Sequence, residues 1–169
     1  MSWFLLAPLD LLVSLLAYPL APIIVLLTDG ATPPAWAWPW MTDDNPIDGD
    51  GGHWERWPND GTTKRVIMRR IAWLWRNRGY GFSTFVTGRM LAGPTYFWGN
   101  RLVSDRPMSA GFCWAYNRGT WGIYAFVPWL PFFKCGLRVR LGWKIPLSVD
   151  CPNERAMLVT HINPIKGYQ

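Results

Sequence analysis

The first 27 residues contain the feature that most constrains the fold, a run of 25 residues with a single formal charge. Trp3 to Leu27 reads WFLLAPLDLLVSLLAYPLAPIIVLL, and the charge is that of Asp10. As one helix this segment would be about 37 Å long, enough to cross a hydrocarbon core about 30 Å thick. No Lys or Arg precedes the run, which argues against a cleaved signal peptide. Such a segment is too apolar to stay in water, so lipid or protein has to cover it.

Three prolines limit how this run can be helical. Pro8 fits in a first helical turn, where a missing N–H costs nothing. Pro19 and Pro22 each remove a backbone donor inside the run. The unbroken helix is therefore predicted to extend only over residues 9–18, which is too short to span a membrane alone. Three interpretations remain: a kinked spanning helix, an insertion at the membrane interface, and a segment buried in protein.

The charge of the rest of the chain is divided between an acidic stretch and a basic one. Residues 29–60 have seven acids and one base, a formal −6, whereas residues 64–166 have sixteen bases and three acids, a formal +13. Together with Asp10 this gives the +6 of the whole chain. A basic half needs an anionic partner, which could be lipid headgroups, nucleic acid or the chain's own acidic stretch. The last can neutralise only part of the charge, because thirteen exceeds six.

Composition separates the chain into three predicted parts. Residues 1–28 form the apolar segment, 29–63 a linker rich in Pro, Trp and Asp, and 64–169 a basic α+β domain. In the linker, Trp36, Trp38 and Trp40 alternate with Ala and Pro. Tryptophans at a polar boundary suit a membrane interface, since indole has an apolar body and one N–H donor. Packing of the same side chains into the protein's own core is an equal alternative.

The linker also contains an acidic, glycine-containing turn at residues 43–52. Dense carboxylates of this kind can bind a hard cation such as Ca²⁺ through oxygen ligands. The candidate ligands are Asp44, Asp48, Asp50 and Glu55. An EF-hand is excluded, because its third position would be Pro46, which has no ligand atom in its side chain. A looser Ca²⁺ turn and an acidic cap on the next element both remain open.

Residues 64–79 are predicted to form a basic amphipathic helix that ends at Gly79. At 100° per residue, one stripe gathers Ile67, Met68, Ile71, Leu74 and Trp75. The arginines lie outside this stripe. Such a helix can lie on a membrane surface or cover a β-sheet with its apolar side, and we expect it to cover the sheet, with the arginines left free.

The remaining sequence predicts a small antiparallel sheet, and hence an α+β fold. Residues 112–116 and 120–124 flank a three-residue hairpin loop at 117–119. Residues 137–145 alternate apolar and basic, which predicts a strand with one apolar and one basic face, paired with residues 156–162 through a connection at 150–154. The run from Ile123 to Phe133 contains Pro128 and Pro131, so we expect an exposed hydrophobic loop rather than a spanning helix.

No catalytic motif is found, so the chain is expected not to be an enzyme. It has two histidines, His53 and His161, and three cysteines without a CxxC pair, which gives a zinc site little support. Nothing resembles a nucleophile elbow, a phosphate-binding loop or HExxH. The odd number of cysteines favours reduced thiols and therefore a cytoplasmic location of the basic domain.

Several short motifs resemble a family of small tailed-bacteriophage proteins of unknown function. The motifs are Thr42-Asp43-Asp44-Asn45-Pro46 with Asp48-Gly49-Asp50, Arg70-Ile71-Ala72-Trp73-Leu74-Trp75-Arg76-Asn77 with Tyr80 and Phe82, Gly142-Trp143-Lys144, and Ile162-Asn163-Pro164. The resemblance implies a viral source and a bacterial host. It assigns no activity and therefore no functional residues.

These observations predict a phage-encoded membrane-associated protein that acts at the host inner membrane during infection. Its partners would be the bilayer or other phage or host subunits, an oligomer is plausible, and no cofactor other than Ca²⁺ is suggested. The alternative is a structural virion component of the portal, tail or capsid, whose basic face contacts DNA through phosphates only. The candidate membrane contacts are Trp3, Phe4, Leu5, Leu11, Leu12, Leu15, Leu16, Trp36, Trp38 and Trp40. The candidate anion-binding residues are Arg65, Arg69, Arg70, Arg76, Arg138, Arg140 and Lys144.

Overall fold

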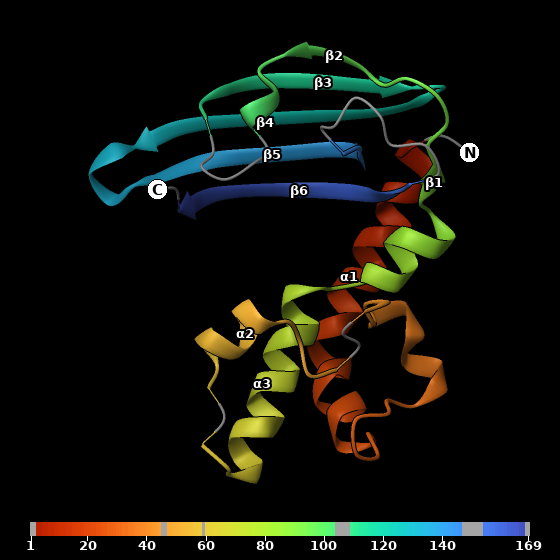
Figure 1. Cartoon of the computed structure of the whole chain (residues 1–169), viewed down its shortest axis with the longest axis vertical. Helices are drawn as coiled ribbons and strands as arrows, with labels where there is room; N and C mark the ends of the chain where they lie inside the picture. Colours follow the sequence, from red (N-terminus) through yellow and green to blue (C-terminus); the bar gives the residue numbers. More distant parts are fainter. Residues whose placement is uncertain (1–2, 45–46, 59, 104–108, 147–153, 168–169) are drawn as a thin grey trace. The chain divides into compact units, whose positions relative to one another are not determined.

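A computed structural model describes residues 3–44, 47–58, 60–103, 109–146 and 154–167 (Figure 1). Pro46 and most of the connection predicted at 150–154, including Cys151, lie outside these residues. The described chain contains helices followed by an antiparallel sheet of six strands, which confirms the α+β class.

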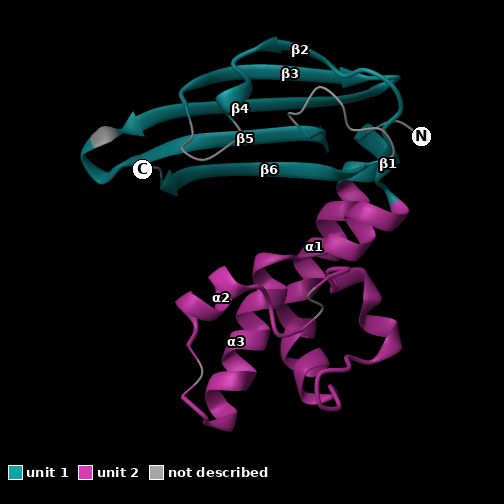
Figure 2. Cartoon of the chain, viewed as in Figure 1, with its two compact units in different colours: residues 1–7, 87–169 teal, residues 8–86 magenta. Residues whose placement is uncertain are grey.

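The chain forms two compact units (Figure 2). Unit 1 consists of residues 1–7 and 87–169, and unit 2 consists of residues 8–86. This division differs from the three predicted parts, since residues 64–86 fold with the apolar segment and the linker instead of with the strands. The reason is that residues of α3 and of the apolar segment share one hydrophobic core.

Unit 2 is helical. Its elements are most of α1 (Trp3–Leu26), the 3-10 helix η1 (Ala35–Trp40), α2 (Gly51–Arg56), α3 (Thr63–Arg76) and the π-helix η2 (Phe82–Val86). One core cluster unites the apolar stripe of α3, through Ile71 and Leu74, with Ala17, Ala21 and Ile24 of α1. The prediction that this stripe covers the sheet was therefore wrong, because the stripe buries its apolar side chains against α1 instead.

The first helix is continuous over 24 residues although Pro8, Pro19 and Pro22 lie inside it, so the predicted limit to residues 9–18 was wrong. Pro22 leaves the carbonyl of Tyr18 without its helical donor, and Nε1 of Trp75 donates to that oxygen at 3.3 Å. A neighbouring helix thus replaces a lost hydrogen bond. At the end of α1, Oγ1 of Thr28 donates to the carbonyl of Ile24 at 2.7 Å and satisfies one of the free terminal acceptors.

Unit 1 contains the sheet, in the order β1-β6-β5-β4-β3-β2 with every neighbouring pair antiparallel. The strands are β1 (Arg89–Met90), β2 (Tyr96–Gly99), β3 (Gly111–Asn117), β4 (Thr120–Leu130), β5 (Cys135–Lys144) and β6 (Arg155–Gly167). Two short 3-10 helices, η3 (Arg101–Val103) and η4 (Pro131–Phe133), precede β3 and β5.

The core of unit 1 is built around aromatic side chains of the central strands. Tyr124, Phe126 and Trp143 are almost fully buried. The hydroxyl of Tyr124 accepts from the backbone N–H of Ile145 at 2.7 Å and lies 2.9 Å from the carbonyl of Trp143. Burial raises the pKa of Tyr124 to about 12, so this phenol stays neutral and can donate to the carbonyl.

The β3–β4 connection is shorter than predicted. Asn117 pairs with Thr120, so the loop consists of Arg118 and Gly119 alone, with φ of 42° and 81°. Positive φ at both positions is typical of a type I′ turn, which suits the twist of a hairpin. Asn117 belongs to the strand because its buried carboxamide accepts from the N–H of Ala92 at 3.1 Å and donates to Thr95 at 3.0 Å.

The predicted hairpin of residues 137–145 with 156–162 is confirmed. Val139 pairs with Ile162, and Arg140 with His161. Because side chains alternate along a strand, Val139 and Leu141 share one face of β5, and Arg138 and Arg140 share the other.

Candidate membrane-contact site

The buried face of α1 includes small side chains beside Ile24 and Val25, whereas its exposed face consists of large aliphatic side chains. Inside unit 2, Ala17 and Ala21 are 1% and 0% exposed, whereas the large side chains of Leu12 and Leu15 on the other face are both 54% exposed. A helix on the surface of a water-soluble protein directs its large apolar side chains toward the core. Small residues at the helix contact and large aliphatic residues outside are typical of helices that face lipid.

The exposed apolar surface of α1 within unit 2 is called the leucine face here. It consists of Leu9, Leu11, Leu12, Leu15, Leu16, Ile23 and Leu26. By length and composition α1 could cross a membrane, and no other helix among the described residues meets that criterion. A core helix of a soluble protein or a signal sequence would meet it too.

Most of the predicted contacts in α1 are on the surface of the protein. Leu11, Leu12, Leu15 and Leu16 belong to the leucine face, and Phe4 and Leu5 are exposed in unit 1. Sequence reasoning missed the other three members, at positions 9, 23 and 26. Helical periodicity could have found all three; for positions 23 and 26 the prolines had argued against a helix beyond residue 18.

The predicted tryptophan contacts divide between core and surface. Trp36 and Trp38 are about half exposed, as membrane contact requires. Trp40 is buried in unit 2, where its Nε1 donates to the carbonyl of Val13 at 2.9 Å. Trp3 is partly buried in unit 1, with its ring centroid 5.7 Å from that of Trp121. Both side chains therefore contribute to packing inside the protein, and Trp40, at 8% exposure, has little surface left for a membrane.

A group of three interfacial side chains adjoins the leucine face. The guanidinium of Arg78 donates to the hydroxyl of Tyr18 and lies over its ring, 5.4 Å from the centroid. The ring of Trp75 lies 6.0 Å from that of Tyr18. Tyr, Trp and Arg are the residue types that accumulate at the boundary between headgroups and acyl chains. Sequence reasoning missed this group because Tyr18 is 57 and 60 residues away from Trp75 and Arg78.

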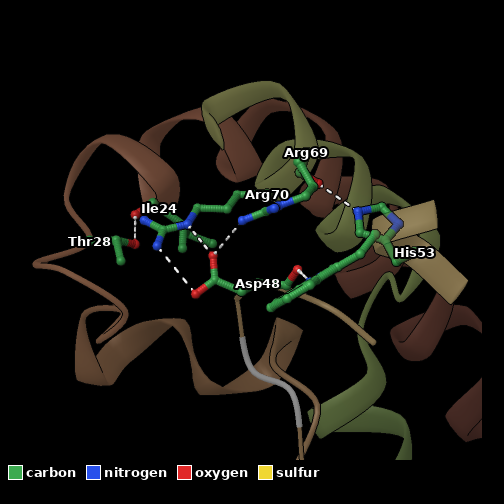
Figure 3. Close-up of polar contacts among 7 residues, drawn as sticks. Ile24, Thr28, Asp48, His53, Arg69 and Arg70 are labelled. Atoms are coloured by element: carbon green, nitrogen blue, oxygen red, sulfur yellow. Dashed lines mark hydrogen bonds and ion pairs between the residues drawn. The ribbon is translucent and has the colours of Figure 1, made fainter. Parts of the chain in front are cut away.

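The acidic turn meets α3 through a clamp on two arginines (Figure 3). The carboxylate of Asp48 accepts two hydrogen bonds from Arg70, from Nε at 2.8 Å and from Nη2 at 3.3 Å. Nη2 of Arg69 lies 3.4 Å from the same carboxylate. The Arg69 guanidinium also lies 5.1 Å from the ring centroid of Trp54, whose Nε1 donates to the backbone carbonyl of Asp48 at 2.7 Å.

A buried histidine completes this arrangement. Nε2 of His53 lies 2.9 Å from the backbone carbonyl of Arg69 (Figure 3), and its ring packs 5.1 Å from that of Trp73. His53 is held in place from its own helix, because the carboxylate of Asp50 accepts from its backbone N–H at 2.7 Å and caps α2. These contacts give the histidine a structural role.

Two further ion pairs neutralise α3. Nη1 of Arg76 lies 3.4 Å from Asp50, and Nε of Arg65 lies 3.1 Å from Asp60. Hydrogen bonds from the side chain and backbone of Thr62 lower the pKa of Asp60, with a further contribution from Arg65. Unit 2 has seven Lys and Arg against eight Asp and Glu, a formal −1. Four of the seven predicted anion-binding residues are thus engaged by the protein's own acids.

The same contacts bear on the predicted cation site. Asp48 and Asp50 direct their carboxylates to arginines, and no group of three or more His, Cys, Asp or Glu side chains in the described part of the chain could hold a metal ion. The acidic turn therefore fits its alternative interpretation, as a cap and counter-charge for the neighbouring helices.

The excess positive charge belongs to unit 1, which has ten Lys and Arg and three acids, a formal +7. The remaining predicted anion-binding residues, Arg138, Arg140 and Lys144, occupy alternate positions along β5. Partial burial lowers the pKa of Lys144, and the positive charges of Arg140 and Arg138 lower it further. The three side chains thus form a concentrated basic region.

Asp10 is the one acid of the apolar segment, and unit 2 buries it. Its carboxylate lies within hydrogen-bond distance of Oγ of Ser83, which is also 2.8 Å from the carbonyl of Gly79. The serine has one hydrogen for two acceptors, so a protonated Asp10 that donates to Ser83 satisfies all three groups. Burial raises the pKa of Asp10 to about 6, and the bond from Ser83 opposes part of that rise.

We expect the stability of unit 2 to fall as the pH rises through 6. The folded state holds the Asp10 proton more tightly than the unfolded state, whose pKa is 3.8, so this contribution is complete below pH 3.8 and lost above 6. The free energy of unfolding should fall by about 3 kcal/mol at most between these two pH values. Denaturant unfolding in mild detergent across this pH range measures it, and Asp10→Asn should remove the dependence because an amide can also donate to Ser83. An unchanged pH profile in Asp10→Asn would contradict this assignment.

The whole chain, residues 1–169, matches the model of a protein family described as a family of unknown function (DUF7338). No curated protein and no solved structure matches the chain. The prediction of a family without known function is therefore confirmed, whereas its phage source stays a prediction.

Proposed function

The chain belongs to this family of unknown function, and we propose that it is a non-enzymatic protein that embeds in one leaflet of a membrane. The observation that supports this most directly is the leucine face, which turns seven large aliphatic side chains away from the protein while Ala17 and Ala21 form the helix contact. The resemblance of residues 42–50 and 70–77 to tailed-phage proteins makes the host inner membrane the proposed location.

An orientation of α1 along the membrane plane fits its surroundings better than one across the bilayer. α3 packs on the inner side of α1 with Arg65, Arg70 and Arg76 on its other sides. If α1 spanned the bilayer, these arginines would be drawn toward the hydrocarbon, at about 3 kcal/mol each near the centre. A helix in the plane keeps one face in acyl chains and the other under protein.

The charge of unit 1 supports attachment to the cytoplasmic leaflet. Its formal +7 would be attracted to anionic headgroups, at about 1 kcal/mol for each Lys or Arg near the surface. Cys113 and Cys135 are free thiols, as a reducing compartment maintains.

Labelling of the two ends of α1 tests this orientation. Cysteines replace Ser2, directly before α1, and the exposed Asp29, shortly after it, one at a time, in a chain with Cys135→Ser and Cys151→Ser in which Cys113 stays buried. With an in-plane helix, a membrane-impermeant maleimide added to sealed inside-out inner-membrane vesicles reacts with both positions. Reaction at only one end would show that the helix crosses the bilayer.

Fractionation of expressing cells tests the location itself. The protein is expected in the inner-membrane pellet and is expected to require detergent for release. Recovery without detergent as a uniform assembly would contradict the proposal. Together with detection in purified phage particles by mass spectrometry, it would instead support the virion alternative, in which other subunits cover the leucine face.

A further inference from the structure

The end of the sheet where β4 turns into β5 exposes a cluster of large apolar side chains. We call this the β4–β5 tip; it consists of Val127, Trp129, Phe132, Phe133 and, from the facing part of β6, Ile165. Phe132 and Phe133 are 97% and 77% exposed. The hairpin end lies at the left of the sheet in Figure 1. Two adjacent phenylalanines this exposed are costly in water unless something covers them.

The tip is a fixed structure. Nε1 of Trp129 donates to the carbonyl of Pro164 at 2.6 Å, which ties the end of β4 to β6. Leu130 pairs with Cys135 across the turn, and Lys134 has a φ of 47°, which closes the chain back into β5. Because these contacts already order the backbone of the tip, little further backbone entropy is lost when the tip inserts into a partner.

Lysine residues lie next to the tip in the sequence, both before β5 and near the end of β6. Residues 109–146 contain no Asp or Glu and five Lys and Arg, among them Lys134 next to Phe133. Lys166 pairs with Gly136 across the hairpin and adds a cation from β6. Apolar side chains at a hairpin end with Lys134 and Lys166 beside them complement an anionic bilayer surface, where the phenyl rings enter the acyl boundary and the ammonium groups meet phosphates.

We propose that the β4–β5 tip inserts into the surface of a bilayer leaflet that contains anionic lipid. This contact is separate from the leucine face, because it belongs to unit 1 and to different side chains. A nucleic acid fits less well, since stacking on single strands needs aromatic platforms along a charged groove and not a protruding pair of phenylalanines.

Binding of the full chain to lipid vesicles tests the proposal. The tip variant Phe132→Ser/Phe133→Ser is compared with Tyr96→Ser/Trp98→Ser, which removes two exposed aromatic side chains from β2 at the edge of the sheet. On vesicles of phosphatidylcholine with phosphatidylglycerol, measured by co-flotation, the tip variant should bind at least about tenfold more weakly than wild type. The β2 variant should bind like wild type, and equal losses in both variants would overturn the proposal.

Charge and the leucine face provide independent controls. Lys134→Gln should weaken binding about fivefold on anionic vesicles and leave binding to pure phosphatidylcholine unchanged. The tip substitutions are repeated in a Leu12→Arg/Leu16→Arg chain, so that the leucine face cannot mask them. If the tip substitutions leave vesicle binding unchanged in both backgrounds, each compared with its own parent chain, the tip proposal is wrong. That conclusion holds even if the Leu12→Arg/Leu16→Arg substitutions themselves weaken binding. A loss restricted to the tip variant would support the tip even if the leucine face proved dispensable.

Discussion

Replacing Leu12 and Leu16 by arginine should transfer the protein from the membrane fraction to the soluble fraction. Both side chains lie on the leucine face, 54% and 41% exposed, so the substitutions remove little packing inside unit 2. An arginine in the acyl region costs about 2–3 kcal/mol even after the side chain reaches toward the headgroups. Two of them should therefore lower the membrane partition coefficient by about a thousandfold.

A variant with the same added charge elsewhere in unit 2 makes this result specific. Ala31 and Thr63 are exposed and lie off the leucine face, so Ala31→Arg/Thr63→Arg should remain in the membrane fraction. Circular dichroism in mild detergent should give the same melting temperature for both double variants. If the Leu12→Arg/Leu16→Arg protein stayed in the membrane while it remained folded, the leucine face would be a contact with protein.

The sequence predicted the elements of this fold better than it predicted their partners. Alternation along residues 137–145 is a local signal, and it correctly gave β5 and its pairing with β6. The hydrophobic stripe of α3 is equally local, but it cannot show which surface the stripe will meet. The decisive surface was the line of small residues at Ala17 and Ala21, and its effect depends on contacts over some 50 residues.

The candidate site was predictable where it depended on exposure along one helix. The prolines made the predicted helix too short, because a missing N–H inside a helix normally breaks it. In the structure, Trp75 donates to the carbonyl of Tyr18 that Pro22 leaves free. The arginines of α3 led to a second wrong expectation, that of a surface free to bind anions. Their periodicity suggests a free basic face, and only the fold brings Asp48 to Arg70, 22 residues away in the sequence.

The Asp48 clamp should be the most sensitive polar contact in unit 2. The side chains of Arg69 and Arg70 are 9% and 14% exposed, so little water can replace the carboxylate. Removal of one partner from a buried ion pair leaves the other charge uncompensated, which costs about 3–5 kcal/mol. Asp48→Ala should thus lower the free energy of unfolding by about 3 kcal/mol, since Asp48 itself is 30% exposed and solvent screens part of the interaction.

An exposed ion pair of the same helix provides the matched comparison. Arg65 and Asp60 are 51% and 48% exposed, and pairs of this kind contribute about 0–1 kcal/mol. Asp60→Ala, which also removes hydrogen bonds to Thr62 next to the start of α3, should lower the free energy of unfolding by clearly less than Asp48→Ala does. Denaturant unfolding of both variants in mild detergent measures the difference. If both variants lost the same free energy of unfolding, solvent would screen the Asp48 clamp as it screens a surface ion pair. Apolar contacts alone would then hold α3 to the acidic turn.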